Sequence, residues 1–180
     1  MYSCKQLFLL IIFLIAPPVS AQPEAPAIAA ASDLKFAVEE VAARFRAELK
    51  REVRLSFGSS GNYYQQISQG APFQVFMSAD EDFVQKLHAA GRTEDQGRLY
   101  ATGRIVLFAP HDSPLQVDAQ MAGLKSAMNA GQIRRFAIAN PEHAPYGRAA
   151  EQALRKLGLW QGLRDRMVLG ENVSRAAQFA

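Results

Sequence analysis

Cysteine is almost absent from this chain, and the single one, Cys4, precedes an apolar run at the N-terminus. Downstream of that run no disulfide can form, and no cysteine can help to hold a structural zinc ion. The three histidines, His88, His111 and His143, are scattered and lack the short spacing of metal ligands. We therefore expect no metal-cation site.

A strong excess of charge is also lacking. The formal net charge is +3, and no run of basic residues occurs. The short charged groups Arg134-Arg135 and Arg164-Asp165-Arg166 are typical of solvated helix faces. Nucleic-acid binding normally needs a basic patch or stripe, so the sequence predicts no nucleic-acid partner.

No apolar run is long enough to cross a bilayer comfortably, because the longest, Leu7–Ala16, falls short of the usual span. Lys5 precedes it, Pro17-Pro18 breaks it, and Val19-Ser20-Ala21 supplies the small residues of a cleavage site. Residues 1–21 are therefore predicted to be a cleavable secretory signal peptide, which places the mature chain in the periplasm. A membrane anchor is the alternative.

The rest of the chain alternates between short apolar runs and segments with helical spacing. This order is typical of α/β folds with a parallel or mixed sheet covered on both faces. The expected strands lie at 27–31, 53–57, 73–78, 105–109, 136–139 and 167–169, and the expected helices at 34–49, 60–70, 80–91, 123–129, 146–157 and from 173.

Motifs of catalysis are missing as well. The nucleophile elbow of serine hydrolases needs G-x-S-x-G, and the stretch Gly58-Ser59-Ser60-Gly61-Asn62 fails at its fifth position. Neither standard glycine-rich phosphate loop occurs. Asp80-Glu81-Asp82 could form a cation cluster, but acidic residues at a helix start are also favoured by the helix dipole. An exported serine hydrolase or transferase stays open as an alternative to a binding protein.

One local pattern occurs four times: a strand ends, a small or turn residue follows, and a helix begins. These junctions lie at Ser32, Ser59-Ser60, Pro145-Tyr146 and Asn172-Val173. In open α/β folds, ligands bind beyond the carboxyl ends of the strands, beside such helix starts. Each start offers unpaired N–H groups and a partial positive charge of about half a unit. If several starts converge, they could enclose an oxyanion without lysine or arginine.

The two serines at these junctions also fit a structural role, since serine is among the best residues for capping a helix. Neither Ser32 nor Ser60 has Glu or Gln three residues later, because Lys35 and Tyr63 occupy those positions. The capping box is therefore absent. Both explanations, capping and anion binding, stay open at this point.

Two carboxylates lie close to the junctions. Asp33 follows Ser32, and Glu171 precedes the junction at Val173. A carboxylate that pointed inward would repel a bound anion. We expect Asp33 to face away from the site or to bond its own helix start.

Several motifs, taken in order, resemble the periplasmic molybdate-binding proteins of ABC importers. Their combination is more specific than any one of them, and it covers nearly all of the chain after the predicted signal peptide. The motifs are Ala29–Ser32, Phe57–Ser60, Gly70–Pro72, Met77–Asp80, Ile105–Pro110, Asn140–Gly147, Leu154–Trp160 and Glu171–Val173.

This resemblance implies a two-lobed, type II periplasmic binding protein of the venus-flytrap kind. Lobe one would comprise residues 26–103, and lobe two residues 104–180. Such a protein captures molybdate or tungstate between its lobes and delivers it to the membrane permease of an ABC importer. It is not an enzyme, needs no cofactor and is expected to be a monomer. A receptor for another tetrahedral oxyanion, such as sulfate or phosphate, is the alternative.

Carried over by position, the resemblance assigns the oxyanion ligand to four residues. Ser32 and Ser60 would donate hydroxyl and backbone N–H groups from the first lobe. Tyr146 and Val173 would donate backbone N–H groups from the second. Molybdenum would thus be bound as an oxyanion, with no protein cation and no metal-cation ligands.

The chain departs from the family in two respects. The segment DLKFA after Ser32 aligns only loosely with some members, so the donor beside Ser32 is not assigned. The family also continues well past Ala180, with a tyrosine that donates its hydroxyl to the oxyanion and with segments that complete both lobes. We therefore expect an incomplete second lobe, weak stability and reduced affinity in the 180-residue chain.

Overall fold

Two parallel sheets form the framework of the computed structural model, which describes residues 24–179. The first sheet has the order β2-β1-β3, with β1 at Ala27–Ala31, β2 at Arg54–Gly58 and β3 at Val75–Met77. The second pairs β4 (Phe136–Ala139) with β5 (Met167–Gly170). The predicted α/β class with parallel strands is confirmed. The predicted signal peptide lies outside the described residues.

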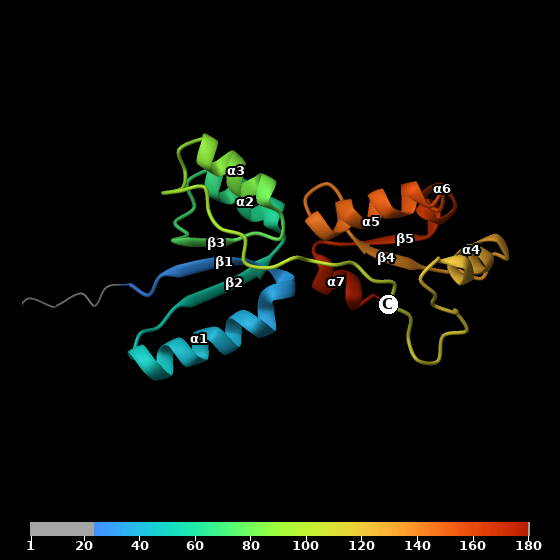
Figure 1. Ribbon diagram of the computed structural model, residues 1–180, viewed down its shortest axis with the longest axis horizontal. Coiled ribbons are helices and arrows are strands. Elements are labelled where there is room, and N and C mark those ends of the chain that lie inside the picture. The colour runs from blue at the N-terminus through green and yellow to red at the C-terminus, as the bar shows by residue number, and fades with distance from the viewer. Residues whose placement is uncertain (1–23, 180) are drawn as a thin grey trace, which may run out of the picture.

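Lobe I is the first sheet with its three helices. A 3-10 turn at Ser32–Leu34 leads into α1 (Lys35–Leu49), and α2 (Ser60–Ser68) and α3 (Glu81–Ala89) follow β2 and β3. Helix α1 covers one face of the sheet, and α2 and α3 cover the other (Figure 1). The tight connections arise because each strand ends in small residues directly before a helix.

Lobe II is the second sheet with its helices. They are α4 (Ala122–Asn129), α5 (Pro145–Lys156), α6 (Trp160–Leu163), a 3-10 turn at Arg164–Arg166 and α7 (Val173–Ala177). Its core is a cluster of four buried leucines. They are Leu124, Leu154, Leu159 and Leu163. The sequence reading missed α6, whose single turn is too short for helical periodicity to show.

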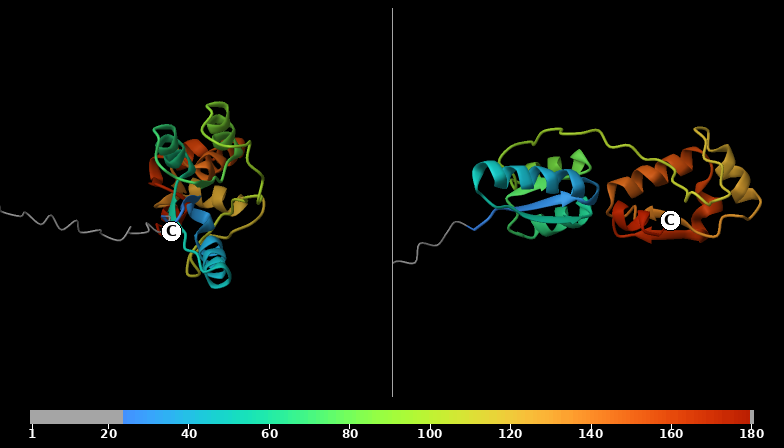
Figure 2. Two further views of the ribbon diagram at one scale, coloured as in Figure 1. Left: turned by 90° about the vertical axis from the view of Figure 1, so that its left-hand side faces the viewer. Right: turned by 90° about the horizontal axis from the view of Figure 1, so that it is seen from below.

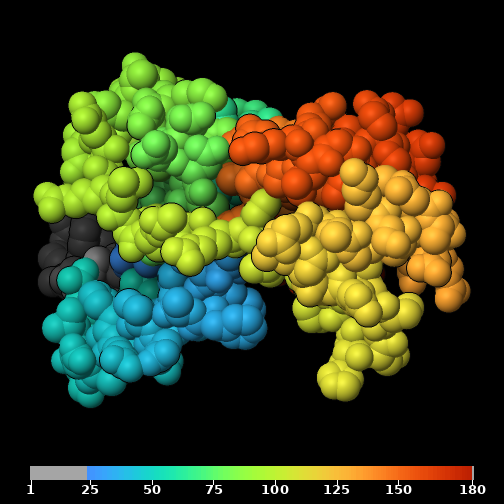
Figure 3. Space-filling model, turned by 45° about the vertical axis from the view of Figure 1, so that its right-hand side comes forward, coloured from blue at the N-terminus to red at the C-terminus, as the bar shows by residue number. Residues whose placement is uncertain are grey.

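The segment that connects the lobes corrects one prediction. Residues 105–109 were expected to form a strand, but they adopt no regular structure. A strand needs a hydrogen-bonded neighbour, and no strand among residues 24–179 pairs with this segment. Val106 is 84% and Phe108 64% exposed, so the apolar run is not buried here. The segment after α3 runs along one side of the molecule from the first lobe to the second (Figures 2 and 3).

Helix α1 is packed along little of its surface. Val38 is its one buried residue. Val41 is 65% exposed and Leu49 57%. Ala42 and Phe45 are half-buried and the other residues of α1 are exposed, so the sheet covers only a narrow stripe of this helix (Figure 1).

Within the described residues, no helix combines the length and the apolarity needed to cross a bilayer.

Asp118 stabilises the start of α4, and its contribution should depend on pH. Its carboxylate accepts N–H bonds from Gln120 at 2.9 Å, Ala122 at 3.0 Å and Gly123 at 2.8 Å. These backbone bonds, chiefly those from Gly123 and Ala122, lower the pKa of Asp118 from its ordinary value. Since the pKa is lower in the folded state, the stabilisation is complete above the unfolded-state pKa. It is lost as the pH falls through the folded-state pKa.

We expect Asp118→Asn to reduce the stability of the chain at neutral pH and to have less effect in acid. Urea unfolding at pH values above and below 3.8, the ordinary aspartate value, measures this difference. Asp112→Asn is a matched control, because Asp112 is exposed. Its carboxylate accepts no hydrogen bond within the described part of the chain. A destabilisation by Asp118→Asn that does not change with pH would contradict the assignment.

Candidate functional site

The two lobes meet at the carboxyl ends of their sheets, where the predicted helix starts lie (Figure 1). We call this contact the seam. On the side of lobe I it contains residues 32–34, 59–62 and 78–80, and on the side of lobe II residues 143–148 and 171–174. A groove runs along it beneath the connecting segment. Its lining includes Asp33, Ser78, Asp80, Tyr100, Tyr146 and Arg148.

The junction at Ser32 contacts both junctions of lobe II. The Ser174 hydroxyl, one residue after Val173, donates to the backbone oxygen of Ser32 at 3.1 Å. The Tyr146 hydroxyl donates to Oδ2 of Asp33 at 2.9 Å. One helix start of lobe I therefore lies against two helix starts of lobe II.

The junction at Ser59-Ser60 makes the second set of contacts across the seam. The backbone N–H of Gly61 donates to the His143 oxygen at 2.9 Å, and the Ser59 hydroxyl donates to the same oxygen at 2.7 Å. The Asn62 amide donates to Oε1 of Glu171 at 2.8 Å. The structure thus brings all four junctions singled out in the sequence to one place.

Ser60 is 1% exposed and sits in the first turn of α2. Its hydroxyl oxygen accepts the backbone N–H of Ala79 at 3.0 Å, which leaves the hydroxyl proton free to donate. The N-cap of α2 is Ser59, and no side chain caps this helix. The capping explanation for Ser60 is therefore wrong, and its hydroxyl is available as a donor.

Ser32 does not cap its helix start either. It is 7% exposed and is the first residue of its 3-10 turn, whose N-cap is Ala31. No side chain caps that turn, and the Ser32 hydroxyl bonds to none of the described residues. The capping explanation for Ser32 is also wrong. The described residues contain no fully buried side-chain oxygen that lacks a hydrogen-bond partner, so the unpaired Ser32 hydroxyl is accessible from outside, as a ligand donor needs to be.

Tyr146 and Val173 stand in the first turns of α5 and α7, directly after Pro145 and Asn172. Helix geometry leaves the N–H groups of a first turn without an intrahelical acceptor. Among residues 24–179, the N–H groups of Ser60, Tyr146 and Val173 have no backbone acceptor. Within the described part of the chain, these three N–H groups are therefore not bound by other backbone groups.

Asp33 and Glu171, two of the carboxylates at the seam, are both engaged from the opposite lobe. Asp33 does not bond its own helix start, as one expectation had it, but accepts the Tyr146 hydroxyl. Burial, together with the hydrogen bond to Asp33, raises the pKa of Tyr146 to about 12, so this hydroxyl stays protonated at neutral pH. Glu171 accepts amide protons from Asn62 and Asn172. These hydrogen bonds stabilise the two carboxylates, but the donors are neutral, so the negative charges of Asp33 and Glu171 stay at the seam.

Comparison with known proteins shows which family the chain belongs to. Residues 27–180 match the family model described as bacterial extracellular solute-binding protein. The chain belongs to this family. Its members are solute-binding proteins rather than enzymes, as the sequence predicts.

Two relatives and one solved structure show the similarity in detail. The molybdate-binding protein ModA of Azotobacter vinelandii is 38% identical over 161 residues, which are 89% of this chain and 62% of that protein. The ModA of Rhodobacter capsulatus is 37% identical over 153 residues, or 84% of this chain and 58% of that protein. The structure of the Azotobacter vinelandii periplasmic molybdate-binding protein matches with a TM-score of 0.66 and 30% identity. It covers 85% of this chain and 65% of that one.

These matches confirm the resemblance inferred from the sequence and the type II periplasmic binding-protein fold. This solute-binding protein spans about three fifths of the length of the curated relatives it matches.

A serine next to a histidine also occurs at the seam, and it bears on the hydrolase alternative. Ser59 Oγ lies 3.0 Å from Nδ1 of His143. The Ser59 hydroxyl also donates to the His143 backbone oxygen at 2.7 Å. With its proton there, Nδ1 would be the donor to Oγ, and the roles across the 3.0 Å contact follow the His143 tautomer. In this solute-binding protein the pair joins the two lobes.

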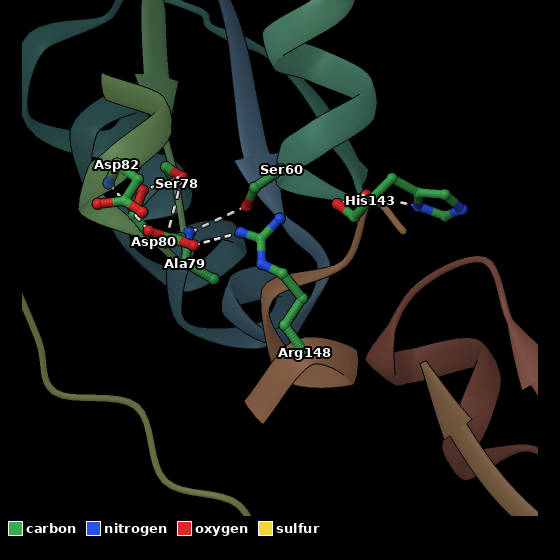
Figure 4. Close-up of polar contacts among 8 residues, drawn as sticks. Ser60, Ser78, Ala79, Asp80, Asp82, His143 and Arg148 are labelled. Atoms are coloured by element: carbon green, nitrogen blue, oxygen red, sulfur yellow. Dashed lines mark hydrogen bonds and ion pairs between the residues drawn. The ribbon is translucent and has the colours of Figure 1, made fainter. Parts of the chain in front are cut away.

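The sequence reading missed one charged contact of the seam. Arg148 of α5 forms an ion pair with Asp80, the residue that caps α3 (Figure 4). The Arg148 guanidinium also lies 4.8 Å from the ring centroid of Phe83. The only local signal was the capping position of Asp80, and nothing in the sequence linked it to Arg148. Among residues 24–179, no cluster of three His, Cys, Asp or Glu side chains could hold a metal ion.

Proposed function

We propose that this chain binds molybdate, or tungstate, at the seam between its lobes. The observation that carries the proposal is the convergence of four helix starts around two nearly buried serine hydroxyls whose protons have no acceptor among residues 24–179. The relatives named as molybdate-binding proteins support this choice of ligand. Ser32, Ser60, Tyr146 and Val173 are the proposed donors.

The chemistry of these donors suits a tetrahedral dianion. Hydroxyl and backbone N–H groups at helix starts only donate to such a ligand, and the helix dipoles favour its negative charge. Arg148, the cation at the seam, is already paired with Asp80. The anion would thus be held by fixed neutral donors, and the spacing of these donors would select it by size and shape.

The wider role follows from the family. We infer that the chain is exported, acts in the periplasm as a monomer and delivers its oxyanion to the membrane permease of an ABC importer. Lobes at residues 26–103 and 104–180 would close around the ligand, because contacts from both sides form only in the closed state. These are proposals because the chain spans about three fifths of the length of the curated relatives it matches.

Titration calorimetry with four oxyanions tests the ligand assignment. We expect one molybdate per chain, comparable binding of tungstate, and binding of sulfate and phosphate weaker by about tenfold or more. Equal binding of all four anions would favour a general oxyanion receptor. Turnover of an acyl or phosphoryl substrate would overturn the proposal in favour of the hydrolase alternative. The 180-residue chain is also expected to bind molybdate with reduced affinity. Tight, stoichiometric binding would contradict that expectation.

A further inference from the structure

The Arg148–Asp80 ion pair is a distinctive contact of the seam. The other ion pairs within residues 24–179 each join residues of the same lobe. The remaining contacts between the lobes are hydrogen bonds. Within the described part of the chain, the pair is thus the only attraction between opposite full charges that acts across the seam.

Both partners are held in place by their surroundings. Oδ1 of Asp80 accepts the Asp82 N–H at 2.9 Å, which leaves Oδ2 for Arg148. Arg148 lies over the ring of Phe83, which is 7% exposed. The side chains of Arg148 and Asp80 are 33% and 20% exposed, so solvent screens the pair only in part. Fixed partners lose less conformational entropy when they pair, which makes this contact stronger than a typical surface ion pair.

The pair is also connected to proposed donors on both sides of the seam. Asp80 follows Ala79, whose backbone N–H holds the Ser60 hydroxyl at 3.0 Å. Arg148 lies two residues after Tyr146 in α5. Figure 4 shows Arg148 extending from α5 towards this loop of lobe I. A change in the pair therefore acts on a hydroxyl donor of one lobe and on an N–H donor of the other.

We propose that Arg148 and Asp80 form a charged clasp that holds the two lobes together and positions the ligand donors of both. Neither residue is assigned to the ligand itself. Arg148 also neutralises a carboxylate that would otherwise repel an anion at the seam. The effect of the clasp on affinity rests on the proposed function, whereas its effect on the contact between the lobes does not.

The test uses Arg148→Gln and Asp80→Asn, which remove one charge each. Asparagine still caps a helix well, so Asp80→Asn leaves the start of α3 supported. Arg155→Gln is the matched control, since Arg155 is on the same helix but pairs with Glu151 of that helix at 2.6 Å. Circular dichroism verifies that every variant is folded.

The first measurement is the distance between spin labels on the two lobes, without ligand. The labels are placed on cysteines introduced at the exposed Arg51 and Lys156, with Cys4, the only native cysteine, replaced by serine. We expect a longer-distance population in Arg148→Gln and in Asp80→Asn, and none in Arg155→Gln. High salt should lengthen the distance in the unmodified chain and have less effect in the two clasp variants.

The second measurement is molybdate affinity by calorimetry. Each clasp variant should bind roughly tenfold more weakly, and the double variant should lose no more than either single one, as expected of coupled partners. Unchanged distances and affinities in Arg148→Gln would overturn the clasp, as would an equal effect of Arg155→Gln. If the unmodified chain binds no molybdate while the distances still lengthen, the proposed ligand fails and the clasp stands.

Discussion

Gly61→Ala should weaken molybdate binding by roughly five- to hundredfold. A Cβ atom at Gly61 would lie 2.3 Å from the His143 backbone oxygen and 2.9 Å from its Cα. Both atoms belong to backbone of the opposite lobe, so no side chain can rotate to make room. Overpacking of this kind costs about 1–3 kcal/mol, and 1.4 kcal/mol corresponds to tenfold in affinity. The lobes must separate, and the Gly61–His143 hydrogen bond is lost with them.

This prediction is checked by calorimetry and by the distance between labels at Arg51 and Lys156. Gln65→Ala is the control, because Gln65 is an exposed residue of the same helix. Thermal stability should change little, since the clash lies between the lobes and not within a core. If Gly61→Ala leaves both the distance and the affinity as they are, the seam does not form in solution.

Ser60→Ala should lower molybdate affinity by about a hundredfold and should also reduce the stability of lobe I. It removes a hydroxyl proposed to donate to the oxyanion, and hydrogen bonds to charged groups contribute about 1.5–3 kcal/mol. It also leaves the Ala79 N–H without the acceptor it now has at 3.0 Å, and an unsatisfied buried group costs about 1–3 kcal/mol. The first loss falls on binding, whereas the second falls mainly on the stability of lobe I.

Calorimetry and urea unfolding separate these two effects. Ser68→Ala is the matched control, because Ser68 lies in the same helix and donates to the Tyr64 oxygen of that helix at 2.7 Å. A Ser60→Ala variant that binds molybdate within twofold of the unmodified chain would remove Ser60 from the site. A turnover activity that disappears in Ser60→Ala would instead support the hydrolase alternative.

The parts of the fold with strong local signals could be predicted from the sequence. The run Ala27–Ala31 is a strand with the predicted bounds, and so is Phe136–Ala139. The four junctions were found for the same reason: each is a short stretch in which an apolar strand gives way to a helix within a few residues. Their convergence followed from a general rule for parallel sheets, which places ligands at the carboxyl ends of strands.

Features that depend on distant partners could not be predicted. Residues 105–109 have the composition of a strand, but a strand also needs a neighbour to pair with, and the pattern carries no information on that neighbour. The Asp80–Arg148 pair joins residues 68 positions apart, and the Asp33–Tyr146 bond joins residues 113 apart. The sequence thus located the four helix starts that converge at the seam and missed the side chains that hold the lobes together.

The local sequence does not show which of Ser59 and Ser60 caps the helix. Both serines precede the same helix, and either could cap it. The structure gives the N-cap position to Ser59, whose hydroxyl contacts His143 of the other lobe, and places Ser60 against Ala79. Tertiary contacts, which the local sequence does not encode, decide the role of each hydroxyl.

The central claim is that an oxyanion is held at the seam by neutral donors from both lobes. A crystal structure with bound molybdate, with data collected at the molybdenum absorption edge, tests it most directly. We predict one anomalous peak at the seam, with ligand oxygens within hydrogen-bond distance of the Ser32 and Ser60 hydroxyls and of the Tyr146 and Val173 N–H groups. A peak elsewhere, or a molybdate held by the Arg148 guanidinium in place of these donors, would contradict the account.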